Sequence, residues 1–219
     1  MDPSTDTLQE PDFHEILTKR LRLRTLRVTD AEALLPLISL ESVMRWTSHG
    51  VVSTLSQAER WTSDRALGKD VFNFAIELRQ HDLRDGDKRP IIGVVGSFHL
   101  PSIGYMIHPD HAGNGYATEA FLAVLPQLFD RIPPLSEGGS GFDHLEGWAD
   151  VENRPSRRIL EKCGFTLCEM RPDPDNDIRG ASEIAIYRKA RPGRTLEELG
   201  LLPIDEGSVQ SKAPTPPVQ

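Results

Sequence analysis

Three stretches in the first half of the chain carry the hydrophobic patterns of β-strands. Residues 21–26 alternate between leucine or threonine and arginine, residues 71–79 place large apolar side chains at every second position, and residues 91–100 are rich in β-branched residues and glycine. The charged link at residues 81–90 contains an Asp-Gly turn signal. We therefore expect the second and third strands to pair as an antiparallel hairpin.

Between the first and second of these strands the pattern changes to a helical period. One predicted helix opens with Thr29 and Glu32 in capping-box positions, and a second opens with Ser56 and Glu59. The connecting residues 44–50 have no period and contain aromatic and histidine side chains. We expect two helices joined by an irregular segment.

The second half of the chain continues with alternating strands and helices. An apolar strand at residues 103–107 is ended by Pro109, which has no amide to donate. A helix is predicted from about residue 116 to 129, and Pro126 is expected either to kink it or to end it early. The remaining predicted elements are a strand at residues 145–148, a helix from Asn153 to Gly164, and closing strands at residues 165–170 and 181–188.

Composition and charge narrow the class of protein. The 219 residues, 38% apolar and 26% charged, are typical of one soluble globular domain, and a net charge of −8 argues against nucleic acid and favours a cationic substrate such as an amine. Cys163 and Cys168 lack metal-ligand spacing and are expected to be buried or bystander thiols in a reducing compartment, and no metal is predicted. No signal-peptide pattern and no apolar run of roughly 18 residues is present, so a cytoplasmic location and no membrane partner are expected.

The turn after the strand at residues 103–107 has the composition of an anion-binding loop. Gly113 and Gly115 allow consecutive amides to point at one phosphate, and the following helix adds its positive end. A nucleoside-triphosphatase loop would end in Gly-Lys-Ser or Gly-Lys-Thr, and a dinucleotide fingerprint would place a small residue where Thr118 stands. The turn therefore predicts a phosphate-bearing ligand of another kind.

Two motifs in order resemble the GNAT superfamily of N-acetyltransferases. The pyrophosphate motif Gln/Arg-x-x-Gly-x-Gly/Ala falls on Ala112, Gly115 and Ala117, so that only its first position departs. The pattern Asn-x-x-Ser-x-Arg-x-x-Glu-Lys-x-Gly-Phe is met in full from Asn153 to Phe165, as in the branch that includes the ribosomal-protein alanine acetyltransferases. An ordinary capped helix is the alternative explanation of the second motif by itself.

The resemblance implies a fold. It covers residues 18–190 and implies an α/β (α+β) domain with the order β-α-α-β-β-β-α-β-α-β-β, in which helices cover both faces of a mixed, mostly antiparallel sheet of about seven strands. Residues 1–17 are expected to be mobile, and residues 191–219 to form a largely disordered tail.

The resemblance also implies an activity and a binding site. The activity is transfer of an acetyl group from acetyl-CoA, by direct attack, to a primary amine of a small molecule or a peptide N-terminus. The residues implied to contact the cofactor are Ile107, Ala112, Gly113, Asn114, Gly115, Tyr116, Ala117, Asn153 and Arg158, although Arg158 is equally explained as part of a solvated helix face. Trp46, His49 and Tyr105 are expected near the acceptor, with core packing the alternative for Trp46.

The chemistry makes two demands on the side chains. The leaving thiolate needs a proton or hydrogen-bond donor. Many family members place a tyrosine where Leu160 stands here, so Ser156 is the predicted substitute, with Tyr105 second. The amine must lose a proton, and Glu146 is the predicted base, with a water chain as the alternative.

Other functions stay open. A CoA-binding module without catalysis is motivated by Leu160 and Ala112, and a less favoured alternative is an ATP-binding enzyme that uses the glycine turn. The amine acceptor is not identified by any motif, and either a monomer or a homodimer is compatible with the sequence.

Overall fold

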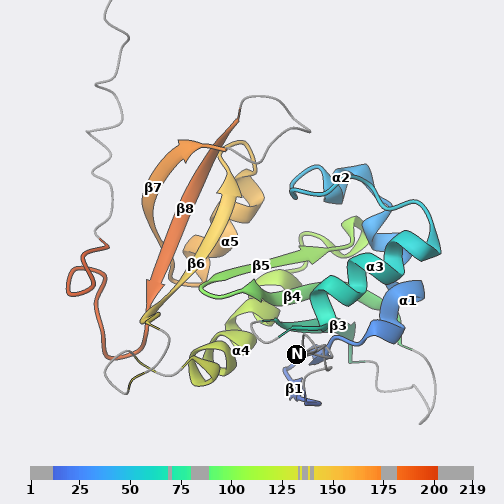
Figure 1. The fold of residues 1–219 in the computed structure, drawn as a ribbon, viewed down its shortest axis with the longest axis horizontal. Helices are drawn as coiled ribbons and strands as arrows, with labels where there is room; N and C mark the ends of the chain where they lie inside the picture. The colour runs from blue at the N-terminus through green and yellow to red at the C-terminus, as the bar shows by residue number, and fades with distance from the viewer. Residues whose placement is uncertain are drawn as a thin grey trace, which may run out of the picture.

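One sheet of eight strands organises the chain (Figure 1). The computed structural model describes residues 12–68, 71–79, 89–132, 134, 138, 141–173 and 182–201. The strands are β1 (Glu15–Leu17), β2 (Leu21–Thr25), β3 (Phe72–Leu78), β4 (Ile91–His99), β5 (Ser102–Ile107), β6 (His144–Asp150), β7 (Thr166–Pro172) and β8 (Glu183–Ala190), in the spatial order β1-β2-β3-β4-β5-β6-β8-β7. The helices are α1 (Ala31–Ile38), α2 (Glu41–Met44), α3 (Leu55–Ala66), α4 (Tyr116–Arg131) and α5 (Arg154–Lys162), with 3₁₀ turns η1 (Val28–Asp30) and η2 (Pro109–His111).

All neighbouring strands are antiparallel except β5 and β6. These two pair in parallel through only two residue pairs, Ser102 with Glu146 and Ile103 with Gly147. Past Ile103 the strands separate, while β6 stays paired with β8 as far as Asp150. Figure 1 shows β6, β7 and β8 turning away from the rest of the sheet where β5 and β6 diverge. A gap with unpaired backbone on both sides is thus built into the middle of the sheet.

Helices cover both faces of the sheet, as predicted. Alternate residues of β3 point to opposite faces, so Phe74 and Ile76 join the core with α4, whereas Ala75 joins the core with α1 and α3. Burial of these two apolar layers supplies the main driving force for folding. Strands β3 and β4 form the predicted antiparallel pair, and the residues of their expected turn, 80–88, lie outside the described residues.

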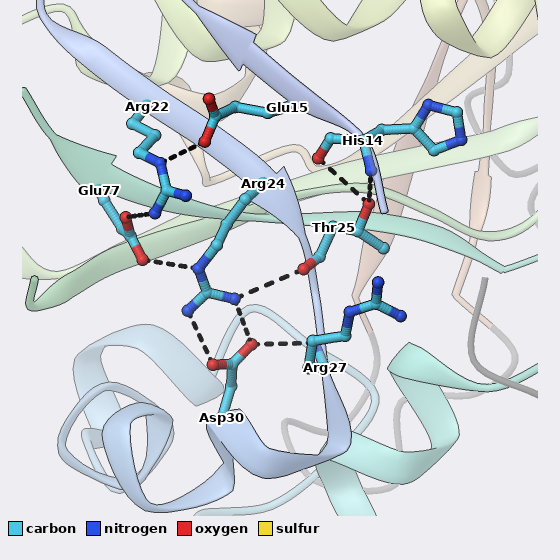
Figure 2. A network of polar contacts seen from close by, with 8 residues as sticks. All are labelled: His14, Glu15, Arg22, Arg24, Thr25, Arg27, Asp30 and Glu77. Carbon is cyan, nitrogen blue, oxygen red and sulfur yellow. Dashed lines mark hydrogen bonds and ion pairs between the residues drawn. The ribbon is translucent and has the colours of Figure 1, made fainter. Parts of the chain in front are cut away.

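The basic face of β2 is neutralised inside the protein, as Figure 2 shows. Arg24 forms a bidentate pair with Asp30, with both N–O distances at 2.8 Å, and donates through Nε to Glu77 at 2.7 Å. Arg22 reaches the other oxygen of Glu77 at 2.8 Å. Because Glu77 is only 3% exposed, these ion pairs are shielded from water, and they join β2, β3 and η1.

Several boundaries differ from the predictions. The sheet has eight strands instead of about seven, because the short strand β1 pairs with β2 inside residues 1–17, which were predicted to be mobile. Three residues are too few to show a period.

Both predicted capping boxes were wrong. The side chain of Asp30 accepts a hydrogen bond from the amide of Arg27 and closes a 3₁₀ turn, so α1 starts after Asp30 without a side-chain cap. The capping box of α3 is formed by Thr54 and Gln57.

Helix α4 continues through Pro126 to Arg131, which resolves the alternative left by the sequence. The carbonyl that loses its partner to Pro126 belongs to Leu122, which is 48% exposed, so water can bond it.

Candidate functional site

The gap between β5 and β6 opens into a cleft of about 1090 Å³. One part of the cleft is lined by β5, the loop before α4, and the start of α5. The other part lies between α2 and α3 and includes side chains from the end of β4. The cleft therefore joins a backbone-lined channel to a side-chain-lined chamber.

The loop before α4 has the geometry of an anion cradle. Gly113 and Gly115 have φ of 78° and 77°, a left-handed conformation that favours glycine. A Cβ atom on Gly113 would meet nothing within 4 Å, so the loop is open on that side. Ala112, Gly113, Gly115, Tyr116 and Ala117 all line the cleft, and α4 begins at Tyr116. Backbone amides and the positive end of a helix therefore face the same space.

An arginine far away in the sequence holds this loop from behind. Arg20 donates through Nη1 to the carbonyl of Asn114 at 2.8 Å and through Nε to Glu119 at 2.7 Å, and its guanidinium carbon lies 4.6 Å from the centroid of the Tyr116 ring. Thr18 donates to the other oxygen of Glu119 at 2.6 Å. Burial alone would raise the pKa of Glu119, but the hydrogen bonds from Thr18 and Arg20 outweigh it and lower that pKa. No local pattern in the sequence indicates this contact.

Asn114 uses its side chain to close the turn, so its predicted contact with the cofactor would come from its backbone amide. Its side-chain amide donates to the carbonyls of His111 and Ala112, at 3.2 and 3.3 Å, and the residue does not line the cleft. A side chain that closes the turn in this way is not free to bind a ligand.

Ser156 and Tyr105 face each other across the gap. Asn153 caps α5 by accepting the amide of Ser156 at 3.2 Å, which places Ser156 in the first turn. Burial raises the pKa of the Tyr105 phenol, and a hydrogen bond with Ser156 partly offsets that increase. Both residues line the cleft, so the two hydroxyl groups predicted from the sequence are brought together.

The side chain of Leu160 is buried between α5 and β6, where it has a packing role. It is 2% exposed, and a Cβ atom on Gly147 would lie 2.3 Å from its Cδ2. The position that holds a tyrosine in many family members thus seats α5 on β6 here.

Glu146, the predicted catalytic base, is held by three neighbouring side chains. It lies opposite Arg188 in the β6–β8 register, and Arg188 donates through Nε to its Oε1 at 2.6 Å. Trp148 donates to Oε2 at 3.0 Å, and His144 lies 3.4 Å from Oε1. Burial would raise the pKa of Glu146, but these bonds outweigh it and lower the pKa to about 2. The carboxylate is held by the protein, outside the residues that line the cleft.

The side-chain-lined chamber contains both predicted acceptor residues, Trp46 and His49. Burial lowers the pKa of His49, and the positive charge of Arg65 lowers it further. Sequence analysis missed Arg65 and Phe98, which also line this chamber. A signal existed, since Ala58, Trp61, Thr62 and Arg65 follow the helical spacing of a buried stripe, and all four are buried.

Comparison with known proteins decides the family. Residues 20–166 match the family model of the acetyltransferase (GNAT) domain. The chain belongs to this family. As a GNAT protein it is an acetyltransferase, and acetyl-CoA-dependent transfer is general to the family, whereas the acceptor varies.

Individual relatives agree with this assignment. An uncharacterised N-acetyltransferase of Bacillus subtilis, YnaD, is 27% identical over 155 residues, which are 68% of this chain and 81% of the relative. A GNAT acetyltransferase from Bacillus anthracis has the same fold, with a TM-score of 0.62 at 21% identity over 81% of this chain and 98% of that one. The microcin C7 self-immunity acetyltransferase MccE, solved with acetyl-CoA and AMP, has a TM-score of 0.59 at 18% identity over 79% of this chain and 93% of its own.

Two features are absent from the described part of the GNAT chain. No helix there has the length and apolar character needed to cross a membrane. Within the same residues, no three side chains of the types His, Cys, Asp and Glu are grouped closely enough to hold a metal ion.

Proposed function

We propose that this protein transfers the acetyl group of acetyl-CoA to a primary amine, carried by a small molecule or by a peptide N-terminus. The observation that supports it most is the continuous cleft that runs from the amide loop through the gap between β5 and β6 to the chamber between α2 and α3. A long ligand with phosphates at one end and a reactive group at the other fits such a shape.

The residues present fit acetyl-CoA. The amides of Gly113, Gly115 and Ala117 would hold the diphosphate, with Ala112 and Tyr116 beside them. Both glycines have positive φ, and the space at the Cβ position of Gly113 is open. The unpaired backbone near Ile107 would bond the pantetheine arm as an added strand. Asn153 and Arg158 line the same channel from α5, and Arg158 would add positive charge. Acetyl-CoA supplies an acetyl thioester that is activated toward an amine.

The two facing hydroxyls would serve the leaving thiolate. Because the pKa of Tyr105 is raised, its phenol stays protonated at neutral pH and keeps its hydrogen available as a donor. Ser156 would donate to the sulfur, with Tyr105 supporting it from β5. Glu146 is bound to Arg188, so we propose that the amine loses its proton to water in the cleft.

The decisive test is binding and turnover in the same preparation. Acetyl-CoA titrated calorimetrically into the wild type should bind saturably. Gly115→Glu should abolish binding, because a side chain at this positive-φ position strains the loop and its Cβ would lie 3.5 Å from Nη2 of Arg20, which holds the loop in place. The matched control is Gly193→Glu, since Gly193 also has positive φ, at 86°, with nothing near its Cβ position and no place in the cleft. Thiol release is then measured against a panel of amines.

The outcomes separate the alternatives. Unchanged affinity in Gly115→Glu counts against the assignment of the loop. Saturable binding with no thiol release from any amine would favour a CoA-binding module, and stabilisation by ATP but not by acetyl-CoA would favour a nucleotide-dependent enzyme.

A cytoplasmic location is also proposed. Cys163 and Cys168 are free and buried, which suits a reducing compartment, and burial raises the pKa of Cys163 to about 11, so its thiol is unreactive. The net charge of −8 disfavours nucleic acid as a partner. The prediction that the chain is either a monomer or a homodimer stays a prediction.

A further inference from the structure

Arg65 is a buried cation in the chamber between α2 and α3. It lies in the last turn of α3 and is 7% exposed. Its guanidinium carbon is 3.9 Å from the centroid of the Trp61 ring and 4.9 Å from that of Phe98. Two aromatic rings therefore hold the charged group in place and leave it little freedom to turn toward solvent.

The charge lacks a protein counter-ion. Over the ranges that the structure describes, no carboxylate forms an ion pair with Arg65, and its buried Nε has no hydrogen-bond partner. Its other contacts are neutral: Nη1 donates to the carbonyl of Trp61 at 3.1 Å, and Nη2 lies 3.4 Å from Nδ1 of His49. Burial of an unpaired charge costs free energy, and burial accordingly lowers the pKa of Arg65 to about 10, despite the opposing charge of exposed Asp64.

Two half-buried arginines in this chain show the usual arrangement. Arg24 is matched by Asp30 and Glu77, and Arg188 by Glu146 and Glu169. Arg65 differs because no carboxylate of the described residues pairs with it, although it lines the cleft. Its Nε is buried, so a ligand in the cleft would meet the remaining hydrogens of Nη1 and Nη2. The fork of donors on a guanidinium matches two oxygens of a carboxylate or of a phosphate.

His49 adds a second donor beside it. Because Arg65 donates toward Nδ1, the neutral imidazole carries its hydrogen on Nε2. His49, Phe98 and Asp64 line the same chamber. The surroundings of Arg65 are therefore a hydrogen-bond donor, an aromatic ring and one exposed carboxylate, which acts on Arg65 through its charge without forming an ion pair among the described residues.

We propose that Arg65 binds an oxyanion, a carboxylate or a phosphate, that is carried by the same molecule as the acetylated amine. The substrate class is therefore a zwitterionic acceptor, with the amine toward the gap and the anion toward α3. This inference rests on the proposed function, because it names the acceptor of the same cleft.

The test compares acceptors that differ only in the anion. The carboxylate pair is the C-terminally amidated dipeptides Ala-Asp and Ala-Asn, and the phosphate pair is O-phosphoethanolamine and ethanolamine. For at least one pair, the wild type should show a kcat/KM at least about tenfold higher for the anionic member, and Arg65→Gln should remove that preference by raising KM. Arg65→Lys keeps the positive charge and should retain part of the preference for the anionic member.

Two controls separate recognition from folding. Arg60→Gln makes the same change on the same helix at an exposed arginine outside the cleft, and it should leave the preference intact. The dissociation constant for acetyl-CoA should stay within about twofold in all the variants, because the cofactor part of the cleft is untouched.

Equilibrium binding of the same four amines, with CoA present, gives a readout that needs no turnover. Binding of an anionic amine that Arg65→Gln abolishes supports the inference even if no thiol is released, an outcome that would sink only the proposed function. Equal turnover of neutral and anionic amines, equal losses for both in Arg65→Gln, or no binding of either anionic amine overturns the inference.

Discussion

Ser156 and Tyr105 illustrate how single residues acquire a role from their neighbours. The backbone amide of Ser156 satisfies the cap of α5, while its hydroxyl faces Tyr105. Because the hydroxyl is not the capping group, its removal should leave the helix intact.

Ser156→Ala should therefore lower kcat by about tenfold or more, while the dissociation constant for acetyl-CoA stays within about twofold. Tyr105→Phe should cause a smaller loss, because the tyrosine supports the serine. The kcat is measured by steady-state thiol release, and the dissociation constant for acetyl-CoA is measured by calorimetry. Wild-type turnover in Ser156→Ala would remove the serine from its proposed role.

The fit of α5 on β6 depends on a glycine and a leucine, which is a property of the two elements together. Gly147 leaves room that the side chain of Leu160 fills. Arg20 fixes the position of α4 in a comparable way. It connects the loop before that helix to the segment that leads into β2.

Gly147→Ala should lower the free energy of unfolding by about 1–3 kcal/mol, because the new Cβ would lie 2.3 Å from Leu160 Cδ2. Leu160→Ala should cost about 2–5 kcal/mol through a cavity. The double variant should lose less than the sum, since the added methyl group occupies part of that cavity. Urea unfolding of all four proteins gives the coupling.

Gly104→Ala is the matched control, because the nearest atom to its Cβ position is 3.9 Å away. Additive effects in the Gly147 and Leu160 pair would show that the two elements do not meet as described.

At the scale of the whole molecule, charge is distributed unevenly. The net charge is −8, yet the chamber holds a buried arginine, so overall charge is a poor guide to the acceptor. Ion pairs between neighbouring strands that are far apart in the sequence, such as Glu146 with Arg188, also connect stability to pH.

Glu146 has a pKa of about 2 in the folded protein, below its ordinary value of 4.5. Its contribution to stability is therefore complete above about pH 4.5 and is lost as pH falls toward 2. Glu146→Gln should lower the free energy of unfolding at pH 7 by about 1–3 kcal/mol and flatten its pH dependence in that window. Urea unfolding between pH 2 and 7 measures both.

Exposed Glu59→Gln on α3 should leave the slope unchanged. Glu146→Gln should also keep most of the turnover, and a large loss of kcat without loss of stability would restore Glu146 as the base.

Local patterns predicted most of the elements and the cofactor loop, but several features lay beyond them. Strand β1 was missed because three residues carry no period. The ion pair of Glu146 could not be predicted, because its partner Arg188 depends on the register between β6 and β8. Arg65 was missed because a charge in a buried helical stripe was not weighed as part of a site.

By itself, the sequence determined the strands, the helices, the glycine turn and the helix capped by Asn153, because these depend on periodicity and on backbone preferences within a few residues. Only the tertiary structure decided that β5 and β6 part after two residue pairs, that Arg20 holds the loop, and that Arg65 lacks a counter-ion. These features are contacts between residues far apart in the chain, and their energies depend on burial and pairing that no local pattern contains.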